Sequence, residues 1–190
     1  HHGYINRMKA ALMAFGYERD DLEVDIIQMV HLVENGEEVK MSKRSGNAVT
    51  IRELIDDVGV DAARYFFISR AVEAQMDFDI GLAKKASNEN PVYYIQYAHA
   101  RAAGLLDRAP QFKAQKTYTH LTSEKEVVLL KLLDSFPDVV AEAAKLRQPN
   151  KMTNFLMQLA SAFHSFYGET KVVDENDPEA TNERIGLVLA

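Results

Sequence analysis

The sequence is best understood from one segment, Val39-Lys40-Met41-Ser42-Lys43-Arg44-Ser45-Gly46-Asn47. It holds two lysines, an arginine and two serines, and no Asp or Glu occurs between Lys40 and Arg52. Lysine ammonium groups attract polyphosphate as point charges, while hydroxyl and backbone N–H groups donate hydrogen bonds to phosphate oxygens. The segment therefore predicts a phosphate-binding loop.

The residues on both sides of this segment agree with that interpretation. Residues 24–33 are rich in β-branched side chains and end at the turn signal Glu34-Asn35-Gly36-Glu37, which predicts a buried strand. Thr50-Ile51-Arg52-Glu53 is a capping box that opens a helix through about Val58, with its positive end toward the loop. The order of a strand, then a loop, then the N-terminus of a helix is typical of a ligand site beyond the carboxyl end of a strand.

Two other interpretations of the basic segment exist. A lone basic pentapeptide is also typical of an exposed surface loop. A nuclear-localisation or nucleic-acid patch would favour an uninterrupted cluster of lysine and arginine, whereas Met41, Ser42 and Ser45 interrupt this one. The flanking strand and helix favour the phosphate loop over both.

Composition limits the class of protein. A chain of 190 residues, 47% hydrophobic and 26% charged, is typical of soluble globular protein, and we interpret it as two domains. The net charge of −6 means that RNA binding would need locally concentrated positive charge. The absence of cysteine excludes disulfides and thiolate metal sites, and no stretch has the length and apolarity of a membrane span. We expect a cytoplasmic protein without a membrane partner.

The first part, residues 1–80, predicts the end of an α/β domain. Apolar spacing predicts an amphipathic helix over 3–15, and Asp61 is a candidate cap for a helix over 62–70. Met76-Asp77-Phe78-Asp79 brings two carboxylates close together, but Asp79 suits the cap of a helix over 80–86 better than a metal site. We expect no bound metal in the protein itself.

The second part, residues 81–190, predicts an all-α helix bundle. Asn90-Pro91 starts what we expect to be the longest helix, and helices are expected over 124–135, over 137–145 and after Pro149, followed by an acidic loop and a broken last helix. The protein is therefore expected to be mostly helical. Because it begins without Met and ends in an apolar run, we expect a fragment of a longer polypeptide.

Tyr93, Tyr97 and Arg101 follow one another at i, i+4 and i+8 along the helix that starts at Pro91. Two tyrosines and an arginine in a row form a suitable stacking and hydrogen-bonding surface for unpaired bases. Packing between helices would produce the same pattern, so spacing alone leaves both interpretations open.

Several stretches also resemble a known family. Lys40-Met41-Ser42-Lys43-Arg44 resembles the KMSKS signature of class I aminoacyl-tRNA synthetases, with Arg at its fifth place. Residues 1–9, 24–47, 60–70 and 90–101 are similar, in this order, to bacterial arginyl-tRNA synthetases. The resemblance implies the end of a Rossmann-like catalytic domain over 1–80 and most of a helical anticodon-binding domain over 81–190.

The resemblance implies ATP-dependent activation of arginine and its transfer to an arginine-accepting tRNA by a monomeric enzyme, with Mg²⁺ carried by the ATP. Lys40 and Lys43 would be catalytic, stabilising charge on the phosphates as pyrophosphate leaves. The residues implied in ATP binding are His2, Gly3, Val30, His31, Leu32, Lys40, Met41, Ser42 and Lys43. Those implied in tRNA binding are Arg44, Tyr93, Tyr94, Tyr97, Arg101, His164 and Tyr167.

For the strand over 24–33, the resemblance implies that adenine contacts the backbone of Val30 to Leu32 rather than the His31 imidazole. The HIGH motif of class I synthetases is absent from the sequence, so we expect the chain to be inactive alone. Two alternatives remain at this point: another class I synthetase, such as the cysteinyl enzyme, and a non-catalytic tRNA-binding module.

Overall fold

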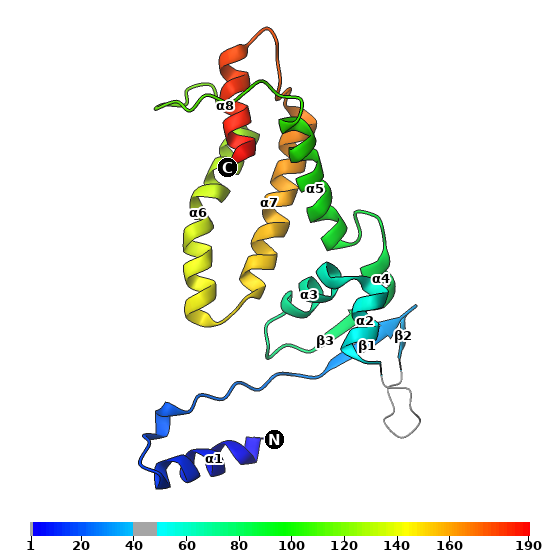
Figure 1. Ribbon diagram of the computed structural model, residues 1–190, viewed down its shortest axis with the longest axis vertical. Helices are drawn as coiled ribbons and strands as arrows, with labels where there is room; N and C mark the ends of the chain where they lie inside the picture. Colours follow the sequence, from blue (N-terminus) through cyan, green and yellow to red (C-terminus); the bar gives the residue numbers. More distant parts are fainter. Residues whose placement is uncertain (1, 40–48) are drawn as a thin grey trace.

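The computed structural model describes residues 2–39 and 49–190. Figure 1 shows an elongated arrangement in which a bundle of long helices lies at one end, a small sheet with short helices lies in the middle, and α1 lies at the other end. The predicted class, an α/β part followed by a helical bundle, is confirmed. None of the helices in the described ranges is both long and apolar enough to span a membrane.

The sheet has three strands in the order β2-β1-β3. Its centre, β1 (Val30–Glu34), pairs antiparallel with β2 (Glu37–Glu38) and parallel with β3 (Met76–Asp79). Asn35 and Gly36 join β1 to β2 with positive φ angles of 54° and 81°, which is the conformation that a two-residue hairpin favours. The predicted turn at this place is confirmed.

The predicted strand over 24–33 is only partly correct. The strand begins at Val30, its side chains are buried only at Leu32, and Ile27 is 70% exposed. The reason is the lack of a neighbouring strand among the described residues: β3 has four residues and starts opposite Val30. Before that point the chain is held by a hydrogen bond from Gln28 N to Val72 O (3.0 Å) and by ion pairs of Glu23 and Asp25 with Arg147. An apolar β-branched run needs such a partner to become a buried strand.

β3 was not expected as a strand, although the alternation of Met76, Asp77, Phe78 and Asp79 is the pattern of a half-buried one. Met76 and Phe78 are buried. The predicted capping role of Asp79 is confirmed, because its Oδ1 accepts a hydrogen bond from Leu82 N at 2.9 Å in α4 (Ile80–Lys84).

The helices of the first part are α1 (His2–Ala14), the short 3₁₀ helix η1 (Arg19–Asp21), α2 (Ile51–Val58) and α3 (Val60–Ile68). The predicted capping box is confirmed: Thr50 Oγ1 accepts from Glu53 N (3.2 Å), and Glu53 Oε2 accepts from Thr50 N (2.7 Å). The helix predicted over 3–15 is confirmed as α1, but none of its residues is buried in the described part of the chain.

The prediction that Asp61 caps the helix over 62–70 is wrong. Gly59, at a φ of 84°, turns the chain between α2 and α3, so α3 begins at Val60 and Asp61 lies in its first turn. The Asp61 carboxylate is therefore free to accept a hydrogen bond from Gln96 Nε2 at 2.9 Å, which joins α3 to the bundle.

The bundle consists of α5 (Pro91–Leu106), α6 (Glu124–Leu146), α7 (Asn150–Glu169) and α8 (Pro178–Leu189). Asn90 caps α5 by accepting from Val92 N (3.0 Å), and Ser123 and Glu126 form the expected capping box of α6. The bundle's core contains Phe166 of α7, which is fully buried against Leu121, Leu129, Val172 and Leu187.

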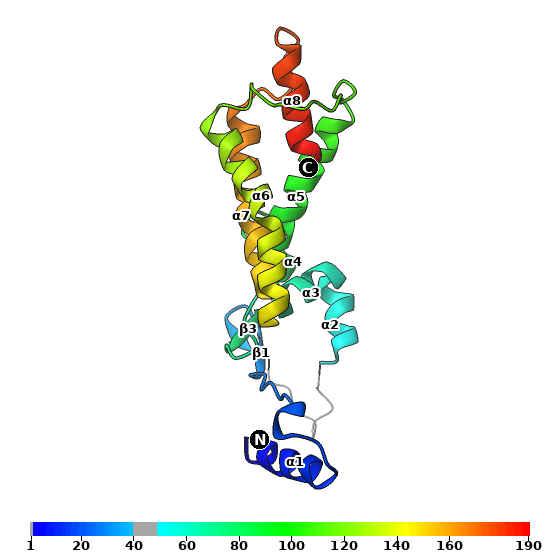
Figure 2. The same ribbon diagram turned by 90° about the vertical axis from the view of Figure 1, so that its left-hand side faces the viewer.

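One bundle prediction is wrong: Pro137 does not separate two helices but lies inside α6. Its 23 residues make α6 longer than α5, which has 16. A proline removes one helical hydrogen bond, at a cost of about 3 kcal/mol. Packing against α7, which lies alongside α6 in Figures 1 and 2, offsets this cost, and the Ser135 hydroxyl donates to Leu132 O (2.7 Å) just before the proline.

The segment before α6 is held to α8 by a buried carboxylate. Glu183 is 2% exposed and accepts hydrogen bonds from Thr119 N (3.0 Å), His120 N (2.7 Å) and His120 Nδ1 (3.0 Å). Burial opposes ionisation of Glu183, but the hydrogen bonds from His120 and Thr119 outweigh it and lower its pKa. The hydrogen bond to Glu183 raises the pKa of His120, with Glu179 also 3.5 Å away.

This pair predicts a pH window of stability. A raised histidine pKa stabilises the fold below the ordinary value of 6.5 and the effect is lost as pH rises through the folded value. A lowered glutamate pKa stabilises above 4.5 and the effect is lost as pH falls through the folded value. The difference in melting temperature between wild type and His120→Gln should therefore be largest between pH 4.5 and 6.5. A difference that does not vary with pH would contradict this prediction.

Candidate functional site

The residues predicted to bind ATP fall in separate parts of the structure. Val30, His31 and Leu32 lie in β1, whereas His2 and Gly3 lie in the first turn of α1. Both views show α1 apart from the sheet (Figures 1 and 2), so the described chain does not bring these two groups together. Lys40, Met41, Ser42, Lys43 and Arg44 lie outside the described residues.

Within β1, the three residues have different surroundings. The Leu32 side chain is buried in the core of the first part, and its carbonyl accepts from Val39 N at 2.8 Å. The His31 ring is half-exposed, with Nδ1 3.9 Å from Asp77 Oδ1. β2 pairs with β1 only at Val33 and Glu34, so beside Val30 that edge of β1 has no partner strand among the described residues.

Six of the seven residues predicted to bind tRNA lie together where α5 packs on α7. We call this group the α5–α7 cluster; it consists of Tyr93, Tyr94, Tyr97 and Arg101 of α5 and His164 and Tyr167 of α7. The rings of Tyr93 and Tyr97 are stacked, with centroids 6.0 Å apart and an interplanar angle of 16°. The predicted i, i+4 row is therefore continuous in space.

Arg101 is the centre of this cluster. Its guanidinium carbon lies 4.3 Å from the ring centroid of Tyr97 and 4.9 Å from that of Tyr167, which are cation–π distances. Its Nη2 donates to the Tyr97 hydroxyl and its Nη1 donates to His164 Nδ1, both at 3.1 Å. None of the ion pairs in residues 2–39 and 49–190 includes Arg101.

His164 connects Arg101 to the backbone of α5. Its Nε2 lies 3.2 Å from the carbonyl oxygen of Tyr94, and its ring centroid lies 4.5 Å from that of Tyr94. Spacing along α5 predicted the row, but no local pattern predicted that two residues of α7 would complete it. The participation of His164 and Tyr167 was expected only from the family resemblance.

The cluster both packs and remains accessible. Tyr97 is 38% exposed, and the other five residues are partly buried. An aromatic face and a cation with free N–H groups, held at a partly open surface, can stack on unpaired bases and donate to phosphate or base oxygens. The two interpretations of the row, helix packing and base binding, are therefore compatible.

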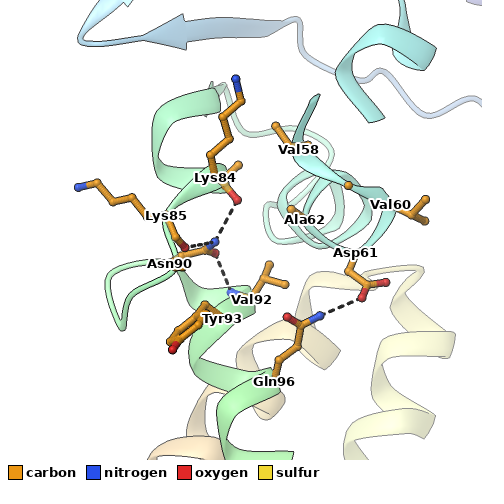
Figure 3. Close-up of a pocket in the computed structure, with 13 residues that line it drawn as sticks. Val58, Val60, Asp61, Ala62, Lys84, Lys85, Asn90, Val92, Tyr93 and Gln96 are labelled. Atoms are coloured by element: carbon orange, nitrogen blue, oxygen red, sulfur yellow. Dashed lines mark hydrogen bonds between the residues drawn. The ribbon is translucent and has the colours of Figure 1, made fainter. Parts of the chain in front are cut away.

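A cavity of about 410 Å³ lies where α3, α4 and α5 meet (Figure 3). Its most buried polar residue is Asn90, 5% exposed, whose Nδ2 donates to the carbonyl oxygens of Ala83 (3.0 Å) and Lys85 (2.9 Å). Lys84 and Lys85 are paired with Asp57 and Glu89 respectively. Because these cations are already neutralised, we assign the cavity's residues a role in joining the two parts of the chain.

Comparison with known proteins identifies both parts. Residues 95–190 match the family model "DALR anticodon binding domain", and residues 9–94 match "tRNA synthetases class I (M)". The arginine–tRNA ligases of Bacillus licheniformis and Geobacillus kaustophilus are 53% and 55% identical to this chain over its full length. The chain spans 35% of the length of each of these curated relatives.

Two solved structures are also similar. An arginyl-tRNA synthetase structure from Campylobacter jejuni superposes with a TM-score of 0.84 at 36% identity, covering 99% of this chain and 42% of that one. The arginyl-tRNA synthetase of Thermus thermophilus, at 20% identity and a TM-score of 0.61, covers 83% of this chain and 31% of its own, and shows the fold alone. The chain therefore belongs to the DALR anticodon-binding domain family, and the segment that precedes this domain matches class I tRNA synthetases.

Proposed function

We propose that this chain is part of an arginine–tRNA ligase, which activates arginine with ATP and transfers it to an arginine-accepting tRNA. Residues 1–80 would belong to the catalytic domain and residues 81–190 to the anticodon-binding domain. The identity with arginine–tRNA ligases over the whole chain supports this enzyme over the cysteinyl alternative. We further propose that the enzyme is monomeric and cytoplasmic.

The ATP-binding role rests on the first part of the chain. Beside Val30 no described strand pairs with that edge of β1, which leaves its peptide groups in reach of a flat base, and α2 begins at Ile51, just after the basic segment. Lys40 and Lys43 would stabilise the charge that develops as pyrophosphate leaves, with Mg²⁺ bound to the nucleotide. His2, Gly3, His31, Leu32, Met41 and Ser42 complete the proposed ATP site.

The tRNA-binding role rests on one observation: Arg101 is partly buried between two tyrosines and has no carboxylate partner among the described residues. Burying an unpaired cation is costly. The chain has 28 Asp and Glu residues, so the lack of a described carboxylate beside Arg101 does not follow from a shortage of acidic residues. A surface that keeps such a cation next to aromatic faces suits single-stranded RNA, whose phosphates and bases use both groups. Arg44, outside the described residues, is a further proposed contact.

Replacement of Tyr97 tests the tRNA-binding role. Tyr97→Ala should weaken binding of an arginine-accepting tRNA transcript by about 1–3 kcal/mol, the free energy of one base-stacking contact. Filter binding with this chain measures the change, and thermal melting measures stability. Tyr17→Ala, which removes an exposed tyrosine beyond α1, is the control and should leave affinity unchanged. A Tyr97→Ala protein with unaltered affinity and a much lower melting temperature would show that Tyr97 only packs.

Measurement of adenylate formation with the full-length protein tests the catalytic role. An arginine–tRNA ligase exchanges pyrophosphate into ATP in a reaction that depends on arginine, whereas a non-catalytic tRNA-binding module does not. Binding of tRNA without any exchange would support the module instead.

A further inference from the structure

We propose that His164 is a positioning residue, which acts as a neutral imidazole with its proton on Nε2 and holds the Arg101 guanidinium in place for tRNA. This inference rests on the proposed tRNA-binding role of the α5–α7 cluster and adds to it the residue that fixes the cation. His164 need not contact RNA for this role.

The two hydrogen bonds of His164 determine its protonation. A carbonyl oxygen can only accept, so His164 Nε2, 3.2 Å from the Tyr94 carbonyl, must carry a hydrogen. A guanidinium can only donate, so His164 Nδ1, 3.1 Å from Arg101 Nη1, must be without one. Only one form of the imidazole satisfies both bonds, which is the neutral Nε2–H tautomer.

The consequence for Arg101 is a fixed plane and direction. A long arginine side chain loses considerable rotamer entropy when it is ordered, so a cation that is already held loses less on binding. His164 Nδ1 and the Tyr97 hydroxyl together accept two of the five guanidinium N–H groups. The other three N–H groups have no acceptor among residues 2–39 and 49–190 and can serve a ligand, while Tyr97 and Tyr167 lie close to the guanidinium.

His164 is itself held by α5, the helix that carries Arg101. Its bond to the Tyr94 carbonyl and its ring contact with Tyr94 fix it about two turns before Arg101. His164 therefore belongs to α7 but determines the orientation of the Arg101 guanidinium on α5. A histidine that only filled space between the helices would need neither bond.

The first experiment uses the chain without RNA. Nitrogen-15 NMR of the histidine side chains, with the His164→Asn spectrum for assignment, reports which ring nitrogen carries the proton. We expect His164 to be neutral and protonated on Nε2 near neutral pH. An Nδ1–H tautomer or an imidazolium at that pH would overturn the inference, whatever the protein binds.

The second experiment is a double-mutant cycle measured as affinity for an arginine-accepting tRNA transcript. His164→Phe should weaken binding about tenfold, because an acceptor for a charged donor is lost. In an Arg101→Ala background the same change should have no further effect, since His164 acts through Arg101. Independent, additive losses would overturn the inference.

Two polar variants refine the cycle and protect it from a folding defect. His164→Asn places an amide oxygen near the position of Nδ1 and should bind within about threefold of wild type. His164→Gln places its amide near Nε2 and should lose affinity as His164→Phe does, so it replaces that variant if the latter fails to fold. If Asn and Gln bind equally poorly while melting like wild type, the inference is wrong. If Arg101→Ala itself leaves affinity unchanged, the proposed function of the cluster fails instead.

Discussion

Lys43→Ala in the proposed full-length arginine–tRNA ligase should lower the rate of arginyl-adenylate formation by about 10²- to 10³-fold, with little change in the affinity for ATP. The physical reason is that negative charge on the phosphates increases as pyrophosphate leaves, so a positioned ammonium stabilises the transition state more than bound ATP. Lys43 lies outside the described residues, and this expectation rests on the sequence of the basic segment.

Arginine-dependent ATP–pyrophosphate exchange and single-turnover adenylate formation separate the two effects. Lys131→Ala is a suitable control, because this variant removes an exposed lysine of α6 and should leave both rates unchanged. If Lys43→Ala raised the Michaelis constant for ATP while the turnover number stayed the same, the lysine would be a simple binding group.

Phe166→Ala should destabilise the bundle by about 3–5 kcal/mol. Phe166 is fully buried between Leu129 of α6 and Leu187 of α8, so its loss removes apolar contacts and leaves a cavity where three helices meet. A domain of this size has only about 5–15 kcal/mol of stability in total, so much of the protein would be close to unfolding. Urea unfolding followed by circular dichroism measures the change.

Phe136→Ala provides the comparison for this variant. Phe136 of α6 is 43% exposed, and its ring lies against that of Phe155, so its truncation should lower the free energy of unfolding much less. Neither residue belongs to the α5–α7 cluster, so affinity for tRNA per folded molecule should be unchanged in both. A loss of stability in Phe166→Ala no larger than in Phe136→Ala would contradict the assignment of the core.

Features that depend on a few neighbouring residues could be predicted from the sequence. The capping boxes at Thr50 and Ser123 and the cap at Asn90 follow from side chains that bond to backbone within three residues. The Asn35-Gly36 turn follows from two adjacent residues that tolerate positive φ. The spacing of Tyr93, Tyr97 and Arg101 likewise placed them on one face of α5. In each case the determining contacts are local.

Features that depend on distant neighbours were missed. Pro137 continues α6 because α7 lies alongside it, and residues 24–29 do not form a strand because β3 does not reach them. The partners that α7 adds to Arg101 lie 63 and 66 positions further along the chain, too far for any periodic pattern to relate them. Such contacts are set by how helices and strands pack, which local sequence determines only weakly.

The Asn90 amide, with its bonds to the end of α4 and the start of α5, has a mechanical consequence. A helix of 16 residues is about 24 Å long, so a tilt of about 5° at its first turn would displace its far end by about 2 Å. That displacement is several times the spread of about 0.5 Å in N–H···O distances, so it would break a hydrogen bond made at the far end. The Asn90 amide therefore fixes the direction in which α5 starts, and the packing of α5 on α7 and α8 must agree with that direction for the far end to be placed accurately.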